Sequence, residues 1–342
     1  MNEKKILDLI NVVAPEVKDI MLKRYNILKI IRENQPIGRR MLAQEIVDTE
    51  RRIRSETDNL RKLGLIIVET NGMFISKKGE DLIEDLEELS YKIKGLKKIE
   101  SSLKDKLGIR DVYMVEGDSS KSNLVFKDLG KKTAKVVEGL IKEDVKIAIM
   151  GGTTMAVVAE QMEEKKYPEN LLVLPGRGGM GESIDIQANS IASKLAKKIG
   201  AKYRLLHVPD NIKPEILEAL KTNPQIKNIL TDLKEVNLLL FGLGRSEDMA
   251  IRRNLPELTR DELRIKKACV ESLGFYFNED GEAIMHSTSV GIALDDLQNI
   301  ENAVCAAAGI KKAKAIYAFS KYYKKYILVT DEVTAKEILK LN

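Results

Sequence analysis

The segment from Ile37 to Ser76 places the strongest constraint on the fold of this chain of 342 residues. In "IGRRMLAQEIVDTERRIRSETDNLRKLG", two apolar runs with helical spacing flank a short polar break, which predicts two helices joined by a tight turn. Thr49 is a candidate N-cap for the second helix, with Arg52 instead of Glu at the capping-box position. "LIIVETNGMFIS" follows, with two β-rich runs around Asn71-Gly72 that predict a type I′ hairpin. A helix-turn-helix followed by a hairpin indicates a winged helix.

The second predicted helix presents polar side chains suited to the major groove of DNA. Guanidinium groups grip phosphates or read guanine edges, and Ser and Asn contact phosphate or base. The alternative is a charged face that contacts only solvent. Residues 1 to 78 carry 16 Lys and Arg against 11 Asp and Glu, so the whole net charge of +5 lies in this part, as expected of a duplex binder. The candidate DNA contacts are Arg39, Arg40, Arg51, Arg52, Arg54, Ser55 and Asn59.

Composition excludes several classes of protein. No apolar run is long enough for a membrane span, and the N-terminus lacks the apolar region of a signal peptide, so we expect a cytoplasmic protein. Cys269 and Cys305 have no CxxC spacing and are expected to be packing residues. With only two histidines in the chain, we expect no metal site and no cofactor. His207, inside the strand-like "YRLLHVP", is expected to be buried.

Helical patterns flank the predicted winged helix on both sides. After the wing, the segment 79–108 reads as a helical linker, and its apolar stripe is either a dimer seam or a surface that lies on a flanking domain. That stripe consists of Leu86, Leu89, Ile93, Leu96, Leu103 and Leu107. Two earlier stripes are expected to pack on the winged-helix core; they comprise Ile6, Leu9, Ile10 and Val13, then Val17, Ile20, Met21, Leu28 and Ile31.

From residue 109 onward, short apolar runs alternate with helical patterns. The runs are "DVYMVEG", "VKIAIMGG", "LLVLPG", "YRLLHVP", "VNLLLFGLG", "NAVCAAAG" and "KYILVTD". Such alternation predicts a doubly wound α/β sheet of parallel strands, with ligands at their carboxyl ends. "GFYFNEDGEAI" interrupts it with an expected hairpin at Asp280-Gly281. We therefore expect a winged-helix DNA-binding domain at 1–78, the linker at 79–108, and an α/β effector-binding and oligomerisation domain at 109–342.

The first glycine-rich loop, Gly151-Gly152-Thr153-Thr154, lies between the strand "VKIAIM" and a predicted helix. Glycines let the backbone approach an anion, and hydroxyls with the amides of a helix N-terminus donate to it. The loop is therefore a candidate phosphate cradle, although it is not a Walker A motif because no Gly-Lys-Ser/Thr follows. The alternative is a tight strand-to-helix turn capped by Thr.

The second glycine-rich loop, Gly176 to Gly181, follows "LLVLP" and matches GxGxxG. A dinucleotide site, and with it a nicotinamide-dependent enzyme, is the weaker interpretation. The strand is not the first of the sheet, Arg177 places a cation in the loop, and no acid follows at the usual spacing, since the next strand ends at Asp210. Arg177, beside Gly178 and Gly179, fits better as a clamp on a second phosphate.

Further charged residues follow other predicted strands or precede the hairpin. Arg252 and Arg253 follow "GLGRSEDMAI", Glu271 precedes the hairpin, and Lys311 with Lys312 follows "AAAGI". Charges at the carboxyl ends of parallel strands converge on one edge of the sheet, so these side chains are candidates for one anionic, hydroxylated ligand. Each of them alone is more often a surface residue.

At these motifs the chain resembles the SorC family of sugar-binding bacterial transcriptional regulators, and within it a repressor of glycolytic genes that senses fructose-1,6-bisphosphate. The anchors are "IGRRMLAQEI", "NGMFISKKG", "GGTTMAVVAE", "PGRGGMGE", "QAN", "YRLLHVP", "RRN", "LGFYFNEDGE", "HSTSVGIALDD" and "ILVTDE", which span nearly the whole chain. The resemblance implies three groups of ligand contacts: Thr153 and Thr154 with Lys312 on one phosphate, Arg177, Gly178 and Gly179 with Arg252 on the other, and Gln187 and Glu271 on sugar hydroxyls.

The resemblance leaves two contacts open. The choice between Arg252 and Arg253 is not decided. "GIKK" precedes Lys312 where related sequences have a turn rich in glycine and serine, which makes that contact the least secure.

The effector domain of that family is similar to sugar-phosphate isomerases and lactonases, which raises the alternative of an enzyme. Those enzymes need a positioned carboxylate or His for proton transfer, supplied by a "GLGxDGH"-like loop. Here the loop reads "GLGRSEDMA" and has no His. We therefore expect no catalytic residues. The expected function is a repressor that binds an operator in duplex DNA as a homo-oligomer, a dimer that becomes a tetramer on DNA, under control of fructose-1,6-bisphosphate.

Overall fold

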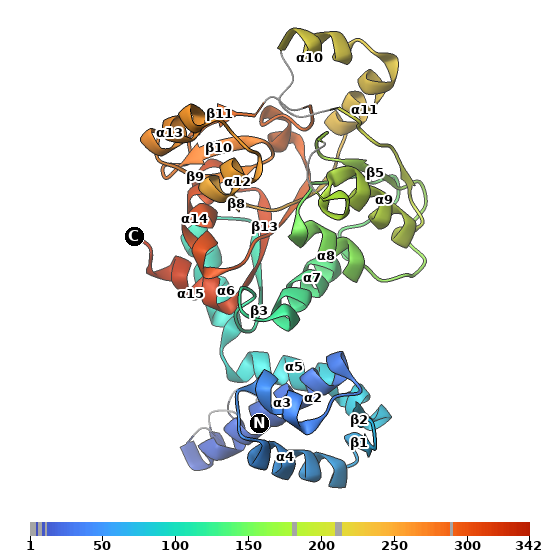
Figure 1. Ribbon diagram of the computed structural model, residues 1–342, viewed down its shortest axis with the longest axis vertical. Helices are drawn as coiled ribbons and strands as arrows, with labels where there is room; N and C mark the ends of the chain where they lie inside the picture. Colours follow the sequence, from blue (N-terminus) through green and yellow to red (C-terminus); the bar gives the residue numbers. More distant parts are fainter. Residues whose placement is uncertain (1–4, 6–8, 11, 180–182, 209–213, 288–289) are drawn as a thin grey trace. The chain divides into compact units, whose positions relative to one another are not determined.

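The computed structural model describes residues 5, 9, 10, 12–179, 183–208, 214–287 and 290–342 (Figure 1). The chain divides into two compact units, Met1–Lys98 and Ile99–Asn342, so that the boundary falls inside the segment expected to be a linker. No helix among the described residues is long and apolar enough to cross a membrane.

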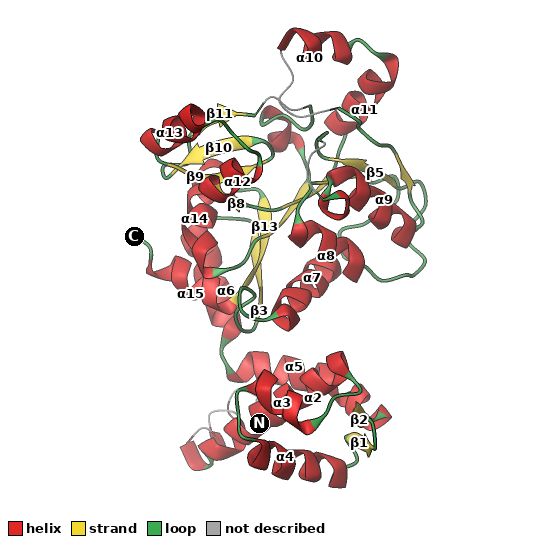
Figure 2. Cartoon of the chain, viewed as in Figure 1, coloured by secondary structure: helices red, strands yellow, loops and turns green. Residues whose placement is uncertain are grey.

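The first unit is a winged helix, as predicted (Figure 2). Its elements are α2 (Pro15–Asn34), α3 (Arg39–Ile46), α4 (Glu50–Lys62), the hairpin strands β1 (Ile66–Glu69) and β2 (Gly72–Ile75), and α5 (Lys77–Ile93). The N-cap prediction is confirmed, because the Thr49 hydroxyl accepts a hydrogen bond from the amide of Arg52 at 3.4 Å. α4 turns Ile53, Thr57 and Leu60 into the core and leaves its opposite face exposed.

The hairpin turn lies one residue earlier than predicted. Glu69 pairs with Gly72, so the turn consists of Thr70 and Asn71, and neither has the positive φ that a type I′ turn requires. Gly72 instead belongs to β2, where its φ is 145°. A Cβ there would lie 3.0 Å from the amide nitrogen of Ile37. The glycine therefore serves the close approach of another segment and not the turn.

The N-terminal apolar stripes pack only in part. Leu28 and Ile31 are fully buried, but the exposed residues include Leu9, Val13, Val17 and Ile20, so their expected packing was wrong. The buried residues of α2 begin only at Tyr25, because the first half of this helix extends beyond the core of the unit. Ile6 lies outside the described residues.

The apolar stripe of the expected linker is divided between two helices. α5 packs against α2 and buries Ile83. In α6 (Leu96–Leu107), the three leucines of the stripe, Leu96, Leu103 and Leu107, are fully buried within the chain. Glu100 on the same helix accepts a hydrogen bond from the amide of Met114 at 2.8 Å. Packing within the chain therefore accounts for the α6 part of the stripe.

The second unit contains a parallel sheet with the order β3-β13-β12-β7-β4-β5-β6. Six of the seven apolar runs supply a strand, which confirms the doubly wound prediction, and "YRLLHVP" contributes only Tyr203 to the short β6. α7 (Asn123–Glu138), α8 (Thr153–Gln161) and α9 (Ala188–Ile199) share one core with the sheet. The strands are β3 (Asp111–Val115), β4 (Lys146–Ile149), β5 (Leu172–Pro175), β6 (Lys202–Tyr203), β7 (Leu238–Phe241), β12 (Asn302–Ala306) and β13 (Tyr326–Asp331).

Helices at the C-terminal end of the chain complete this unit. α14 (Ala313–Tyr322) packs its Phe319 ring 5.7 Å from that of Phe241 and 5.8 Å from that of Tyr326. α15 (Glu332–Lys340) follows β13 and packs on α14. α10 (Pro214–Lys221) and α11 (Pro224–Lys234) lie between β6 and β7 along the chain. The prediction for His207 was wrong, because β6 is an edge strand that ends at Tyr203 and leaves the histidine exposed in irregular chain.

A second sheet of four antiparallel strands, in the order β11-β10-β9-β8, is formed by the part of the chain between β7 and β12. The predicted hairpin joins β10 and β11, but its turn centres on Glu279 and Asp280, because the amide of Gly281 donates to the carbonyl of Asn278 at 3.1 Å. The turn between β9 and β10, at Leu273 and Gly274, was not predicted. The elements are β8 (Gly244–Arg245), α12 (Ser246–Arg252), α13 (Glu257–Ile265), β9 (Ala268–Ser272), β10 (Phe275–Asn278) and β11 (Ala283–His286).

The parallel sheet has a topological switch between β4 and β7. These two strands are neighbours, and the chain continues from β4 outward to β5 on one side and from β7 outward to β12 on the other. The loops that follow β4 and β7 therefore diverge and leave a crevice at the carboxyl ends of the strands. The antiparallel strands and α12 follow β7 directly, so they border this crevice.

Candidate functional site

A cavity of about 290 Å³ lies at this switch point, near the lower end of the ~300–1,000 Å³ typical of small-molecule sites. Loops after β4, β5 and β7 contribute to its wall, together with β9 and the start of α9. Its charged lining residues are Arg177, Arg252, Arg253 and Glu271. Three cations against one carboxylate, with several amides, suit a polar and anionic ligand. The other lining residues are Met150, Gly151, Gly152, Gly178, Gly179, Ile186, Gln187, Ala188, Gly242, Met249, Asn254, Ser272 and Leu273.

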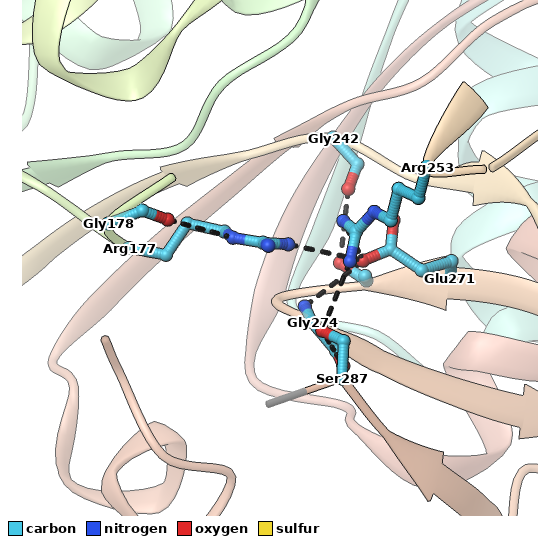
Figure 3. A network of polar contacts seen from close by, with 8 residues as sticks. Arg177, Gly178, Gly242, Arg253, Glu271, Gly274 and Ser287 are labelled. Carbon is cyan, nitrogen blue, oxygen red and sulfur yellow. Dashed lines mark hydrogen bonds and ion pairs between the residues drawn. The ribbon is translucent and has the colours of Figure 1, made fainter. Parts of the chain in front are cut away.

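A network of charged groups on the cavity wall centres on Glu271 (Figure 3). Its Oε1 accepts a hydrogen bond from Arg253 Nη2 at 2.6 Å and lies 3.9 Å from Arg177 Nη1. Arg253 also donates from Nη1 to the Ser287 hydroxyl at 3.1 Å, and this hydroxyl donates to the carbonyl of Gly274 at 2.9 Å. The Arg253 guanidinium is thus held on two sides by protein groups.

The β9–β10 hairpin positions the carboxylate of Glu271. The amide of Gly274, in the turn, donates to Oε1 at 3.1 Å. Glu271 is only 5% exposed, and its described contacts all reach the same oxygen. Oε2 has no hydrogen-bond partner among the described residues, which leaves it available as an acceptor on the cavity wall. The buried Tyr276 is paired with Glu271 across the strands, and burial raises the pKa of its hydroxyl to about 12.

Two glycines permit the backbone geometry of the loops. Gly152, which begins α8 as its N-cap, has a φ of 114° and open space where a Cβ would lie, a conformation that disfavours L side chains. Gly178 donates its amide to Val290 at 2.8 Å, and a Cβ on it would lie 2.8 Å from the carbonyl oxygen of Val208. The loop after β5 is therefore packed tightly against its neighbours, with Arg177 directed at Glu271.

Lys312 lies in the turn η3 (Ile310–Lys312) after β12, outside the lining of the cavity. Burial lowers the pKa of its ammonium group. The carboxylates of Asp248 and Asp331 oppose this change, while the positive charge of Arg252 adds to it. The Lys312 side chain has no hydrogen bond or ion pair with any described residue.

Most predicted effector contacts converge on the cavity. Thr153 and Thr154 begin α8 but do not line the cavity. Met180 and Gly181 of the GxGxxG motif lie outside the described residues, as does Asp210. The sequence indicated Arg253 only as an alternative to Arg252. It gave no indication of Ser287, because the contact of this hydroxyl with Arg253 depends on how the hairpins fold. The predicted residues on the cavity wall are Gly151, Gly152, Arg177, Gly178, Gly179, Gln187, Arg252 and Glu271.

The predicted DNA contacts in the first unit fall into two groups. Arg39 donates to Asp58 at 3.2 Å and is half-buried, and Asn59 is also half-buried. Arg52 lies 3.6 Å from Asp48, but its side chain remains 73% exposed. The Lys23 ammonium and the Thr49 amide hold the pKa of the Asp48 carboxyl below its usual value. The other members of the set, Arg40, Arg51, Arg54 and Ser55, are also exposed.

The cavity lacks the groups that proton-transfer enzymes use most often. Its described lining contains no His, Cys or Lys, and Glu271 already accepts hydrogen bonds from Arg253 and the Gly274 amide and lies 3.9 Å from Arg177. Within the described ranges, no three His, Cys, Asp or Glu side chains come together as a metal site requires. The arrangement is suited to binding an anion with hydroxyl groups.

Two family models match the chain. Residues 20–90 match the CggR N-terminal DNA binding domain, and residues 91–340 match the Sugar-bind model of sugar-binding domains. The chain is 39% identical over 339 residues to the central glycolytic genes regulator of Priestia megaterium, covering 98% of this chain and 99% of the relative. It is 36% identical to the regulator of the same name from Bacillus subtilis, over 95% of this chain and 96% of the relative.

Solved structures agree with these relatives. A SorC family transcriptional regulator from Enterococcus faecalis has 38% identity and a TM-score of 0.67, covering 71% of this chain and all of that one. The full-length sorbitol operon regulator of Klebsiella pneumoniae has 17% identity and a TM-score of 0.65 over 94% of this chain and 99% of its own, which shows the shared fold. The relatives at 36–39% identity are transcriptional regulators, which confirms the prediction of a regulator and not an enzyme. The chain belongs to the SorC family of sugar-binding transcriptional regulators.

Proposed function

We propose that this protein is a cytoplasmic repressor of central glycolytic genes whose effector is fructose-1,6-bisphosphate. The observation that carries the proposal is the cavity at the switch point, where three arginines and one carboxylate surround a volume suited to a small sugar phosphate. The regulators of central glycolytic genes that resemble the chain over almost its whole length support the gene set.

One phosphate of the effector binds at the N-terminus of α8. The first amides of a helix have no partner within it and carry the positive end of its dipole. Thr153 and Thr154 add their hydroxyls at this position, after the bend at Gly152. Lys312 supplies the cation from the turn η3 after β12, where its side chain has no hydrogen bond or ion pair with a described residue.

The second phosphate binds to the loop after β5, at Arg177, Gly178 and Gly179, with Arg252. Arg253 is a poor candidate for this contact, because both sides of its guanidinium already donate to Glu271 and Ser287. Arg252 lines the same cavity. The geometry therefore favours Arg252 for the ligand and Arg253 for holding Glu271 in place.

The sugar hydroxyls bind between the two phosphates, at Gln187 and Glu271. Both residues line the cavity. The Arg253 and Arg177 guanidinium groups and the Gly274 amide anchor Oε1 of Glu271, which presents Oε2 to a ligand hydroxyl. A hydroxyl that donates to a carboxylate forms a charge-assisted hydrogen bond, which is stronger than a neutral one.

The exposed face of α4 binds the operator, and the intact protein binds as a dimer that becomes a tetramer on DNA. A single winged helix buries little surface, so two half-sites must be held together to give high affinity. We place the dimer contact beyond residue 78, within the 79–108 linker and the 109–342 effector and oligomerisation domain. Sedimentation of the full-length chain on operator DNA tests this, and a monomeric complex would contradict it.

A thermal-shift panel tests the effector assignment. A ligand that binds only the folded state raises the melting temperature by mass action. We expect fructose-1,6-bisphosphate to give the largest shift, and fructose-6-phosphate a smaller one because it fills only one phosphate site. Equal shifts with both sugars, or none with either, would refute the bisphosphate proposal.

A further inference from the structure

Val47, in the turn between α3 and α4, combines a strained backbone with an almost fully exposed side chain. Its φ of 58° and ψ of 48° place it in the left-handed region, which β-branched residues rarely adopt. Its amide donates to the carbonyls of Ala43 and Gln44 and so ends α3. The residue is 91% exposed, so burial of the isopropyl group does not compensate for the backbone strain.

Glycine is the residue that such a position favours for stability. It adopts the left-handed region without strain and is the usual residue after the last turn of a helix. The side chain of Val47 does not pack in the core, and backbone strain of this kind concentrates at functional sites. The turn therefore points to a role for the isopropyl group outside the folding of this unit.

The surroundings of Val47 indicate what it contacts. Arg40 and Gln44 of α3 and Val47, which caps its end, line a concave surface. Thr49, the N-cap of α4, and Arg52 of α4 complete it. Its two arginines are exposed. The single acidic group there, Asp48, is already paired with Lys23 at 2.9 Å and lies 3.6 Å from Arg52.

The lining of this concave surface thus presents two arginines, while its one carboxylate is already paired, which is complementary to DNA phosphates; the exposed Glu45 and Glu50 flank the turn outside this lining. Arg51 and Arg54, also exposed, extend the positive charge along α4. An apolar group at the centre of a cationic surface matches the apolar parts of a duplex, which are the thymine methyl groups in the major groove and the deoxyribose rings.

We propose that Val47 makes an apolar contact with operator DNA, and that the strained turn is retained because it presents the isopropyl group to the duplex. This inference rests on the proposed binding of an operator by the winged helix. Arg40 and Arg52 then position the backbone of the duplex, while Val47 contributes apolar contact.

The test compares three variants of the full-length chain on one duplex, selected by the wild-type protein from a random pool. Val47→Gly removes both the side chain and the strain. Val47→Ala removes the two methyl groups but keeps an L residue in the turn, so it controls for added flexibility. Lys267→Gly is the matched control, because Lys267 is another exposed residue with a positive φ, at 54°, and lies in the second unit.

We expect both Val47 variants to bind the selected duplex about ten-fold more weakly, the order of magnitude for two methyl groups that lose apolar contact. The thermal transition of the winged helix should not fall in Val47→Gly, and Lys267→Gly should bind DNA like the wild type. Replacing each thymine of the duplex in turn by deoxyuridine, which lacks the methyl group, locates the contact. If Val47 contacts a thymine methyl group, the replacement at that position should weaken the wild type but not the Val47 variants. If Val47 contacts deoxyribose, no replacement should matter, and the Val47 variants should bind all these duplexes more weakly than the wild type.

Three results would overturn the proposal. Wild-type affinity in Val47→Gly would show that the side chain does not contact DNA. Loss of affinity with an equally large fall of the winged-helix transition would assign Val47 a structural role, and a changed sedimentation coefficient without DNA would assign it to contacts between subunits. If the wild type selects no duplex at all, operator binding itself fails, which is distinguishable because no variant comparison then exists.

Discussion

Arg253→Ala should destabilise the second unit far more than the same change at its exposed neighbour Arg252. The substitution removes a hydrogen bond of 2.6 Å to Glu271 and one of 3.1 Å to Ser287. Loss of one partner of a buried ion pair costs about 3–5 kcal/mol of folding free energy, and a hydrogen bond to a charged group contributes about 1.5–3 kcal/mol. Glu271 would keep the Gly274 amide and the more distant Arg177, so we expect a cost below the ion-pair range and within the hydrogen-bond range, about 2 kcal/mol.

Calorimetry of the full-length chain measures this cost, because the larger unit gives the transition with the larger enthalpy. A loss of about 2 kcal/mol lowers the melting temperature of a domain of this size by about 4–8 °C, whereas Arg252→Ala should change stability by no more than about 0.5 kcal/mol. In a Glu271→Gln background the cost of Arg253→Ala should fall by about 1 kcal/mol or more. Equal shifts for the two arginines, or an unchanged cost in the Gln background, would refute the Glu271–Arg253 pairing.

Three further predictions concern other parts of the molecule. Arg52→Ala should weaken operator binding in a filter-binding assay and leave effector binding, measured by calorimetry, unchanged. If Arg52 contacts a base edge, the loss of binding free energy should be about 1–3 kcal/mol; if it contacts a phosphate, operator affinity should depend less steeply on salt concentration. Burial lowers the pKa of Lys312. The affinity for fructose-1,6-bisphosphate should therefore be highest below that pKa and decline as pH rises through it, at a lower pH than for an ordinary lysine. Lys312→Met should remove this pH dependence. Thr49→Ala should destabilise the winged helix by about 1 kcal/mol, measured by its thermal transition, because the amide of Arg52 loses its cap.

Local sequence signals predicted the elements that local chemistry determines. Six of the seven apolar runs after residue 109 became strands of the parallel sheet, because strands buried on both faces need continuous apolar sequence. Thr49 was identified as a cap from its own side chain and its place before an apolar pattern. The glycine-rich loops were located at the correct edge of the sheet because the carboxyl ends of parallel strands share one edge.

The details that depend on contacts between distant segments could not be predicted in this way. Gly72 resembles a turn residue in sequence, yet its place in β2 depends on the approach of Ile37. Arg253 and Glu271 belong to different elements, and their pairing depends on a hairpin at Leu273 and Gly274 with no strong turn signal. His207 follows an edge strand whose short length is not encoded in the apolar run itself.

Titration of the operator complex with fructose-1,6-bisphosphate tests the central claim most directly, with fructose-6-phosphate and no ligand as parallel arms. A ligand shifts an equilibrium only by its differential affinity for the two states, and we propose that a bisphosphate gains this difference by bridging the loops after β4 and β5. The account predicts that the bisphosphate changes operator affinity in the wild type and that Arg177→Ala abolishes this response while it leaves DNA binding without ligand intact. An unchanged response in Arg177→Ala, or an equal response to the monophosphate, would contradict it.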